Sequence, residues 1–252
     1  MNTRYYFCRG IVTLLALIFF SSSTWAQNNK PNVIFILADD LGYTDVACYG
    51  SKYYETPNID RLAKQGIRLT SGYTCGPNCT PTRAALMSGQ YGPRTGVYTV
   101  GSIDRFNWRS RPLRPVDNVE NLPLDRTTIA GALKKAGYAT ALFGKWHLGQ
   151  KGPFHPSERG FDEAIVSMGK HFDFQTSPKV RYPQGTYLAD FLTDKAVDFI
   201  RRHKEKPFFL YLAHFAVHSP FQANALVRQG ARGSQPRKGA TRIPIVFSSP
   251  PP

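Results

Sequence analysis

Three small groups of polar residues each follow a short apolar run in this 252-residue sequence. Paired carboxylates are hard oxygen ligands that suit Ca²⁺ or Mg²⁺ rather than zinc. Lysine and histidine in the other two groups would form a cationic wall, and a divalent metal opposite such a wall suits a tetrahedral oxyanion ester, either sulfate or phosphate. The groups are Asp39 and Asp40 after residues 33–37, Lys145 and His147 after residues 138–143, and His218 after residues 207–213.

Cys79 is the candidate nucleophile for such a site. It lies two residues before Pro81, at the start of a predicted helix, where backbone N–H groups and the helix dipole favour negative charge. Arg83 follows one helical turn later. A thiol in this position would be acidified, so the residues alone leave a cysteine hydrolase open. A structural disulfide between Cys75 and Cys79 is the alternative.

Each polar group alone is a weak signal, because adjacent aspartates often cap a helix and a lone histidine is more often structural than catalytic. Their shared placement after apolar runs strengthens the prediction. In open α/β sheets, ligands bind outside the carboxyl ends of the strands. We therefore expect the three groups to meet at one edge of a sheet.

The apolar periodicity predicts an α/β fold. Continuous apolar runs are typical of strands that are buried on both faces. Strands that alternate with helices indicate a mostly parallel sheet with helices on both faces. The predicted strands cover residues 33–37, 138–143 and 207–213, and the predicted helices cover residues 56–66, 81–88, 127–137 and 187–204.

Residues 79–89, Cys-Thr-Pro-Thr-Arg-Ala-Ala-Leu-Met-Ser-Gly, resemble the signature of the formylglycine-dependent sulfatases, arylsulfatase-like members of the alkaline phosphatase superfamily. Similar motifs occur at residues 32–42, 56–60, 144–149 and 216–220, where Val217 replaces a usual proline. The resemblance covers Pro31 to about Gln222. It implies an incomplete alkaline-phosphatase-like sulfatase domain, with residues 31–221 as the N-terminal part of the catalytic domain.

The resemblance also implies a role for each candidate residue. Cys79 would be oxidised by a maturation enzyme to formylglycine, whose hydrated aldehyde attacks sulfur and later releases sulfate. Calcium, preferred over magnesium, would assist. Asp39, Asp40 and the modified Cys79 would bind the metal, Arg83 would hold the formylglycine, His147 would hydrogen-bond its hydroxyl, and Lys145 and His218 would contact the sulfate.

The function that the resemblance implies is hydrolysis of a sulfate monoester on a small molecule or glycan. A phosphonate or phosphate-ester hydrolase of the same superfamily is the nearest alternative. An inactive, truncated fragment is another, because the family's second metal-binding pair lies beyond the matched residues. Calcium takes about 6–8 oxygen ligands, so we expect the chain as written to hold the ion weakly.

Residues 1–26 are typical of a secretory signal peptide. Arg4 and Arg9 precede an apolar run at residues 11–20, and small residues follow it. The run is shorter than the ~20 apolar residues that span a bilayer. The sequence thus predicts export to the periplasm or medium, with no stable membrane anchor.

The net charge of +15 raises the possibility of a nucleic-acid partner. Residues 222–252, however, contain five cations and no acid, and they read as a basic tail that is disordered or out of frame. Aromatic residues are not interleaved with basic residues in any stripe of the sequence. We therefore expect no nucleic-acid partner.

Overall fold

The computed structural model describes residues 30–105 and 107–223. The chain divides into two units, residues 1–31 and 32–252, and everything below concerns the second unit. The predicted signal peptide lies outside the described residues, as does the predicted tail from residue 224 onward. In the described part of the chain, no helix is long and apolar enough to cross a membrane.

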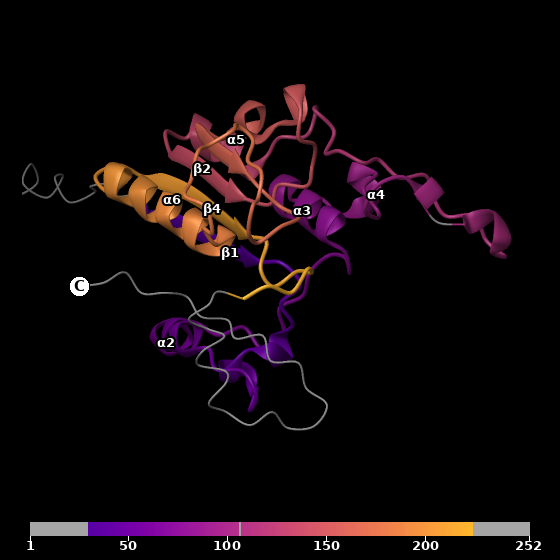
Figure 1. Ribbon diagram of the computed structural model, residues 1–252. Helices are drawn as coiled ribbons and strands as arrows, with labels where there is room; N and C mark the ends of the chain where they lie inside the picture. The colour runs from indigo at the N-terminus through magenta and orange to yellow at the C-terminus, as the bar shows by residue number, and fades with distance from the viewer. Residues whose placement is uncertain (1–29, 106, 224–252) are drawn as a thin grey trace, which may run out of the picture. The chain divides into compact units, whose positions relative to one another are not determined.

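A four-stranded parallel sheet forms the centre of this unit (Figure 1). Its strands are β1 (Val33–Ala38), β2 (Ala139–Gly144), β3 (Glu163–Val166) and β4 (Phe208–His214). The order across the sheet is β1-β4-β2-β3, and every neighbouring pair is parallel. The prediction of a mostly parallel α/β fold is confirmed. The sequence did not predict β3, whose apolar run is only three residues long, Ala164 to Val166.

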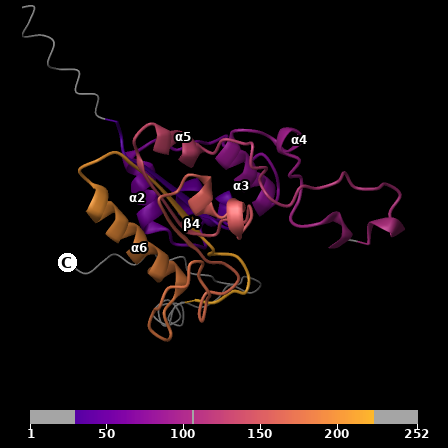
Figure 2. The same ribbon diagram turned by 90° about the horizontal axis from the view of Figure 1, so that it is seen from above.

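Helices cover both faces of the sheet, as predicted (Figures 1 and 2). On one face, α6 (Leu188–His203) buries Leu192 and Phe199 against Leu210 and Leu212 of β4. On the other, α3 (Cys79–Ser88) and α5 (Ile129–Lys135) pack over Tyr211. Successive side chains of a strand point to opposite faces, so β4 contributes to both cores and all seven of its residues are buried.

The predicted helices form, with small differences at their ends. Thr56 is the N-cap of α2 (Pro57–Gln65), and Gly89 ends α3 in the left-handed region at φ +67°. The third helix begins after Thr128, whose hydroxyl accepts a hydrogen bond from Gly131 N at 3.0 Å. The described residues also include the short α4 (Gly92–Thr95) and six 3₁₀ turns: Tyr43–Asp45, Ala47–Tyr49, Ile103–Arg105, Trp108–Ser110, Gly152–Phe154 and Pro156–Arg159.

β2 and β4 approach each other closely where β2 ends. Gly144, the last residue of β2, has φ +117°, and a Cβ built there would overlap the carbonyl oxygen of Ala213 on β4. The next amide, Lys145 N, donates to that same oxygen at 2.8 Å. Glycine is therefore required for the approach that positions Lys145.

Among the described residues, β1 lies at one edge of the sheet and packs against the core through one face. Val33, Phe35 and Leu37 pack against the core that includes α3 and α5. Ile34 and Ile36, which alternate with them, remain 47% and 50% exposed. The strand thus presents both an open edge and an apolar outer face.

Candidate functional site

The carboxyl ends of β1 and β2, together with helix α3, bring five of the predicted residues together. Asp39, immediately after β1, is 4% exposed and binds two cations. Its Oδ1 lies 2.9 Å from Arg83 Nη2, and its Oδ2 lies 2.5 Å from Lys145 Nζ. Buried charges require such partners, because desolvation otherwise disfavours them. We call Asp39, Cys79, Arg83, Lys145 and His147 the strand-end cluster.

Arg83 is the central connection of the cluster. Besides Asp39, its Nη1 donates to the carbonyl oxygen of Lys145 at 2.7 Å and to the hydroxyl of Tyr211 at 2.9 Å. Burial raises the pKa of Tyr211, so this hydroxyl stays protonated at neutral pH. Sequence reasoning missed Tyr211, because a tyrosine inside a buried strand gives no sign of which helix it faces.

Cys79 begins α3 and faces His147. Its Sγ lies 3.3 Å from His147 Nδ1. Burial, with Lys145 and Arg83 nearby, lowers the pKa of His147 to about 4, so the imidazole is neutral at pH 7. In a neutral imidazole one ring nitrogen donates a hydrogen bond and the other accepts one. The pair therefore has the geometry for proton exchange at the side-chain atom of residue 79.

Left-handed backbone conformations orient the side chains that follow β1 and β2. Asp40 has φ +60° and His147 has φ +59°. Such values are uncommon for residues other than glycine and turn the chain sharply. As a result, Asp39 and Asp40 do not share one environment. Asp39 is buried within the strand-end cluster, whereas the side chain of Asp40 is 62% exposed.

Asp40 pairs instead with His218, the last of the predicted residues. Asp40 Oδ2 lies 3.6 Å from His218 Nε2, and the His218 side chain is 32% exposed. His218 Nδ1 donates to the carbonyl oxygen of Ser219 at 2.6 Å. The Asp40–His218 pair is near enough to the cluster for His218 to contribute to the lowered pKa of His147.

The loop that carries His218 is anchored at two points. Asp39 exchanges two backbone hydrogen bonds with it, donating to Ala216 O at 2.9 Å and accepting from Val217 N at 2.8 Å. His171, which is 2% exposed, donates from Nε2 to the carbonyl oxygen of His218 at 2.9 Å. Its ring contacts Phe215 at a centroid distance of 5.0 Å. Sequence reasoning missed His171 as well, since no motif marks it.

The donor chemistry of Asp39 and Asp40 suits a hard divalent cation, but these residues do not complete a site for one. Both carboxylate oxygens of Asp39 are bound to cationic side chains. Within residues 30–105 and 107–223, no group of three or more His, Cys, Asp or Glu side chains is placed to hold a metal. Two carboxylates are also fewer oxygens than calcium requires.

The state of the cysteines decides whether Cys75 and Cys79 form a structural disulfide, the alternative to a nucleophilic Cys79. Cys48, Cys75 and Cys79 are all free thiols. The thiol of Cys75 is exposed and contacts Pro81 O at 3.5 Å. The alternative of a Cys75–Cys79 disulfide is therefore wrong in this structure, and Cys79 keeps its side chain available.

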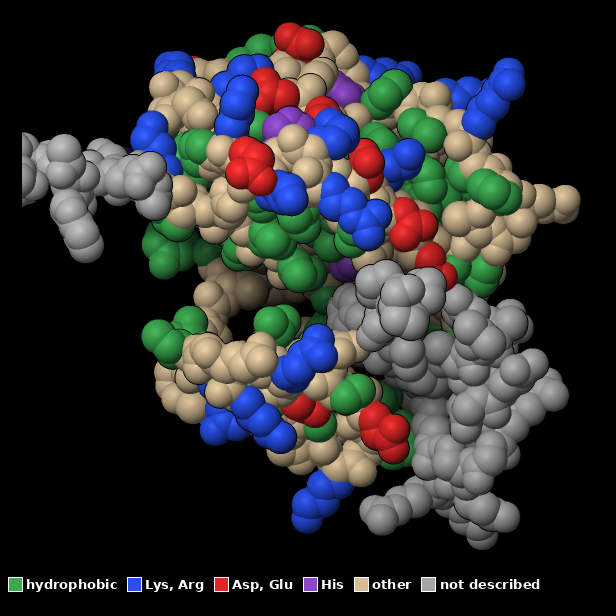
Figure 3. Space-filling view, turned by 90° about the vertical axis from the view of Figure 1, so that its left-hand side faces the viewer, with side chains coloured by type: hydrophobic (Ala, Val, Ile, Leu, Met, Phe, Trp, Pro, Cys, Tyr) green, Lys and Arg blue, Asp and Glu red, His purple; other side chains and the backbone are tan. Residues whose placement is uncertain are grey.

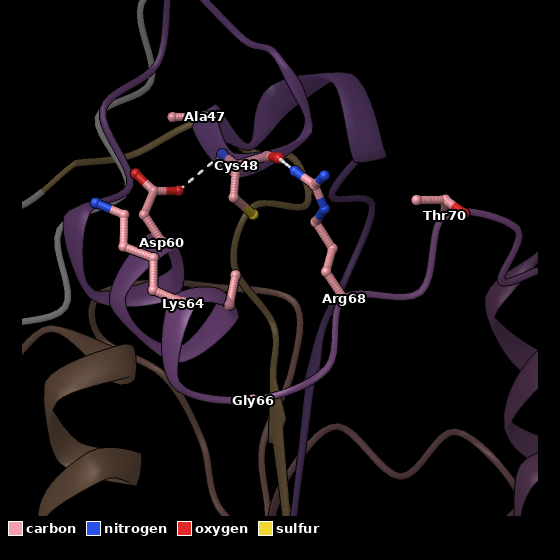
Figure 4. A pocket seen from close by; sticks show the side chains of 8 residues that line it. Ala47, Cys48, Asp60, Lys64, Gly66, Arg68 and Thr70 are labelled. Carbon is pink, nitrogen blue, oxygen red and sulfur yellow. Dashed lines mark hydrogen bonds between the residues drawn. The ribbon is translucent and has the colours of Figure 1, made fainter.

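A cavity of about 630 Å³ lies apart from the strand-end cluster (Figure 4). Cys48 N donates to Asp60 Oδ1 at 2.8 Å within it, and Arg68 donates to Cys48 O. None of its lining residues belongs to the cluster.

On the face drawn in Figure 3, basic and acidic side chains are interspersed rather than separated by sign.

Comparison with known families gives one match over most of the chain. The family model described as "Sulfatase" matches residues 31–245. The predicted domain boundary at residue 221 stays a prediction.

Several curated relatives share this similarity. The chain is 36% identical over 217 residues to human N-acetylgalactosamine-6-sulfatase, covering 77% of this chain and 41% of that protein. It is 47% identical over 148 residues to a sulfatase of Formosa agariphila, covering 55% and 27% of the two chains. The chain thus spans less than half the length of these relatives.

Solved structures agree with the fold. The crystal structure of Ps i-CgsB in complex with k-i-k-neocarrahexaose superposes with a TM-score of 0.68 at 33% identity, covering 83% of this chain and 50% of that one. The structure of BT4656 in complex with D-glucosamine-2-N,6-O-disulfate superposes with a TM-score of 0.64 at 27% identity, covering 84% and 40%.

Proposed function

The chain belongs to the sulfatase family, and we propose from this membership that it hydrolyses a sulfate monoester through a formylglycine made from Cys79. The observation that carries the proposal is the placement of Cys79 at the first turn of α3, 3.3 Å from His147 Nδ1. A maturation enzyme is the partner that the modification requires. When present, the hydrated aldehyde supplies the hydroxyl that attacks sulfur.

The side chains around residue 79 have distinct tasks in this proposal. His147 holds and moves a proton at the oxygen of the modified residue, for which its lowered pKa keeps it neutral. Lys145 and the N–H groups of the first turn of α3 stabilise charge on the transferred sulfate. Arg83 fixes Lys145 and Asp39 in place through one hydrogen bond to each, and a third hydrogen bond to Tyr211 holds Arg83 itself. His218 is the other proposed contact of the sulfate.

Sulfatases in general use a divalent metal as well as formylglycine, and calcium is our proposal for the ion. Asp39 and Asp40, with the modified Cys79, are its proposed ligands because carboxylates are hard oxygen donors. For Asp39 to join, its contact with Lys145 must loosen, which would free the lysine for the sulfate. The remaining calcium ligands would come from beyond these residues or from water.

The proposed substrate is a sulfated sugar. The human relative is named for a sulfated N-acetylgalactosamine, and two similar structures are complexes with neocarrahexaose and with disulfated glucosamine. Arginine, lysine and histidine side chains at the strand ends suit the charge of such a group. Export to the periplasm or medium, where polysaccharides are met, fits the sequence of residues 1–26.

The test is to produce the chain together with a formylglycine-generating enzyme and to analyse the peptide that contains residue 79. We expect this peptide to be lighter than encoded and to react with aldehyde probes. Cys79→Ala should abolish turnover of an aryl sulfate without loss of fold, whereas Cys75→Ala, the matched control, should retain it.

Two results would count against this function. Full activity of a protein whose Cys79 remains unmodified would support a thiol hydrolase. Faster turnover of an aryl phosphate than of the matching aryl sulfate would support a phosphate-ester hydrolase instead.

A further inference from the structure

A long connection between α4 and α5 begins beside the nucleophile. Asn78, the N-cap of α3 and the residue before Cys79, donates from Nδ2 to Thr99 Oγ1 at 3.5 Å. Residues 98–105 and 107–119 follow, drawn in magenta in Figure 1, and most of them are exposed. We call them the arm.

A single asparagine closes the base of the arm. Asn118 Oδ1 accepts from Tyr98 N at 2.7 Å and from Thr99 N at 3.0 Å. Its Nδ2 donates to Thr99 O at 3.2 Å and to Gly101 O at 2.7 Å. These four hydrogen bonds hold the outgoing and returning segments of the arm together next to α3. The base of the arm therefore lies beside the first turn of α3, which Cys79 begins, and the rest of the arm projects away from it (Figures 1 and 2).

The outer part of the arm gathers arginines around one tryptophan. The guanidinium of Arg109 lies 4.5 Å from the centroid of the Trp108 ring, and that of Arg114 lies 5.5 Å from it. Both side chains are well exposed, at 73% and 55%. Trp108 Nε1 donates to Asp104 Oδ1 at 3.1 Å, which fixes the ring. The expectation of no basic-aromatic stripe is wrong for residues 105–114, Arg-Phe-Asn-Trp-Arg-Ser-Arg-Pro-Leu-Arg, where four arginines alternate with aromatic and other residues.

This arrangement is suited to binding a polyanion. A guanidinium stacked on an indole keeps its N–H groups free at its edge, where they can bind two oxygens of one sulfate. Stacking also restricts the side chain before binding, so less conformational freedom is lost. The acids nearby are Asp104, 3.8 Å from Arg109, and Asp117, 2.5 Å from Arg114. Exposed ion pairs of this kind are weak and can be exchanged for a ligand.

We propose that the arm binds the part of a sulfated glycan that extends beyond the ester at Cys79, with Arg109 and Arg114 contacting sulfate groups on neighbouring sugars. This inference rests on the proposed sulfatase function, because it takes the ester that is cleaved to lie at Cys79. In this proposal the arm selects substrates by their length and charge, and the strand-end cluster carries out the reaction.

The first experiment measures binding of a sulfated heparin hexasaccharide to the full chain carrying Cys79→Ala, by titration calorimetry. Arg109→Gln with Arg114→Gln should weaken binding about tenfold or more, since each charged hydrogen bond contributes enough affinity for such a change. Arg201→Gln with Lys204→Gln, which removes the same charge from the end of α6, should change it less than about twofold.

Variants of Trp108 test whether binding depends on the arrangement of side chains in the arm or only on the charge of the arm. Trp108→Ala leaves the net charge unchanged but releases both guanidiniums, and we expect binding to weaken several-fold, with Trp108→Phe partly restoring it. Equal losses in the arm variants and in the α6 control, or unchanged binding in Trp108→Ala, would overturn the inference. So would equal affinity for the desulfated hexasaccharide, or tighter arm-dependent binding of a DNA oligonucleotide of equal charge.

Turnover of 4-nitrophenyl sulfate by the matured protein, without the Cys79→Ala change, distinguishes the two proposals. The arm variants should leave it unchanged, because this substrate does not reach the arm. A loss of this turnover in the arm variants would contradict the inference. Arm-dependent hexasaccharide binding by a protein that never turns over the aryl sulfate would instead refute the proposed function alone.

Discussion

Asp39 is the residue on which both buried cations of the site converge. Arg83 and Lys145 each bind a different oxygen of its carboxylate, and all three side chains are almost fully buried. Removing one member of a buried ion network leaves an uncompensated charge, which costs more than the contact itself contributes. Substitutions here will therefore change stability and activity together, and the two effects must be measured separately.

At the residue scale, the first prediction concerns Lys145 and His147. Each of Lys145→Ala and His147→Ala should lower aryl-sulfate turnover by ~10²-fold or more, because positioned charge and proton transfer are lost. Lys145→Ala should also lower the melting temperature, since Asp39 loses a partner, whereas His147→Ala should not. Steady-state kinetics and thermal melting of the same preparations check both. His203→Ala, on α6, is the control, and an equal loss of activity there would contradict the strand-end site.

At the scale of elements, the loop after β4 depends on His171. His171→Phe keeps the aromatic contact with Phe215 but removes the hydrogen bond to His218 O. We expect kcat to fall about tenfold with a loss of stability near 1 kcal/mol, the usual contribution of one hydrogen bond. His171→Gln can donate again and should recover part of kcat.

Kinetics of the two His171 variants beside His155→Phe tests this positioning role. The imidazole of His155 contacts Ser157 at 2.8 Å and lies outside the strand-end cluster. If His171→Gln and His171→Phe lost activity in proportion to stability alone, His171 would be only a packing residue.

The topology of the sheet explains which site residues the sequence could predict and which it could not. Asp39, Lys145 and His147 were predicted to meet because parallel strands present their carboxyl ends at one edge. Tyr211 and His171 were not predicted, because their roles depend on which strands are neighbours. The order β1-β4-β2-β3 places β4 between β1 and β2, and no periodicity within one strand encodes that order.

The same limit applies to the separation of Asp39 from Asp40. Both carboxylates stay the proposed ligands of one metal, although their side chains lie in different surroundings. The left-handed conformation of Asp40 turns its side chain toward His218. A backbone dihedral of this kind is set by the surrounding loops, here by the hydrogen bonds of Asp39 with Ala216 and Val217, and adjacency in sequence cannot predict it.

At the scale of the whole molecule, the apolar outer face of β1 favours self-association. Ile34 and Ile36 are about half exposed on an edge strand whose outer N–H and C=O groups can pair with another chain. Ile34→Thr with Ile36→Thr keeps β-branched residues in the strand while making that face polar. We expect less light scattering at equal concentration and an unchanged circular dichroism spectrum.

Leu37→Thr provides the contrast for this prediction. Leu37 points to the opposite face of β1 and packs against the core, so its replacement should destabilise the fold by about 1–3 kcal/mol. Unchanged scattering by the Ile34/Ile36 double variant would show that β1 is not the surface through which copies associate.

The close approach of β2 and β4 at Gly144 has a consequence for the genetics of this protein. Any missense allele at this codon would behave as a null allele, although the residue has no side chain with which to touch a substrate. The atom that it would meet is the backbone oxygen of Ala213, which every amino acid carries. A second-site suppressor therefore cannot arise by shortening the neighbouring side chain, and reversion at codon 144 itself is the expected route back to function.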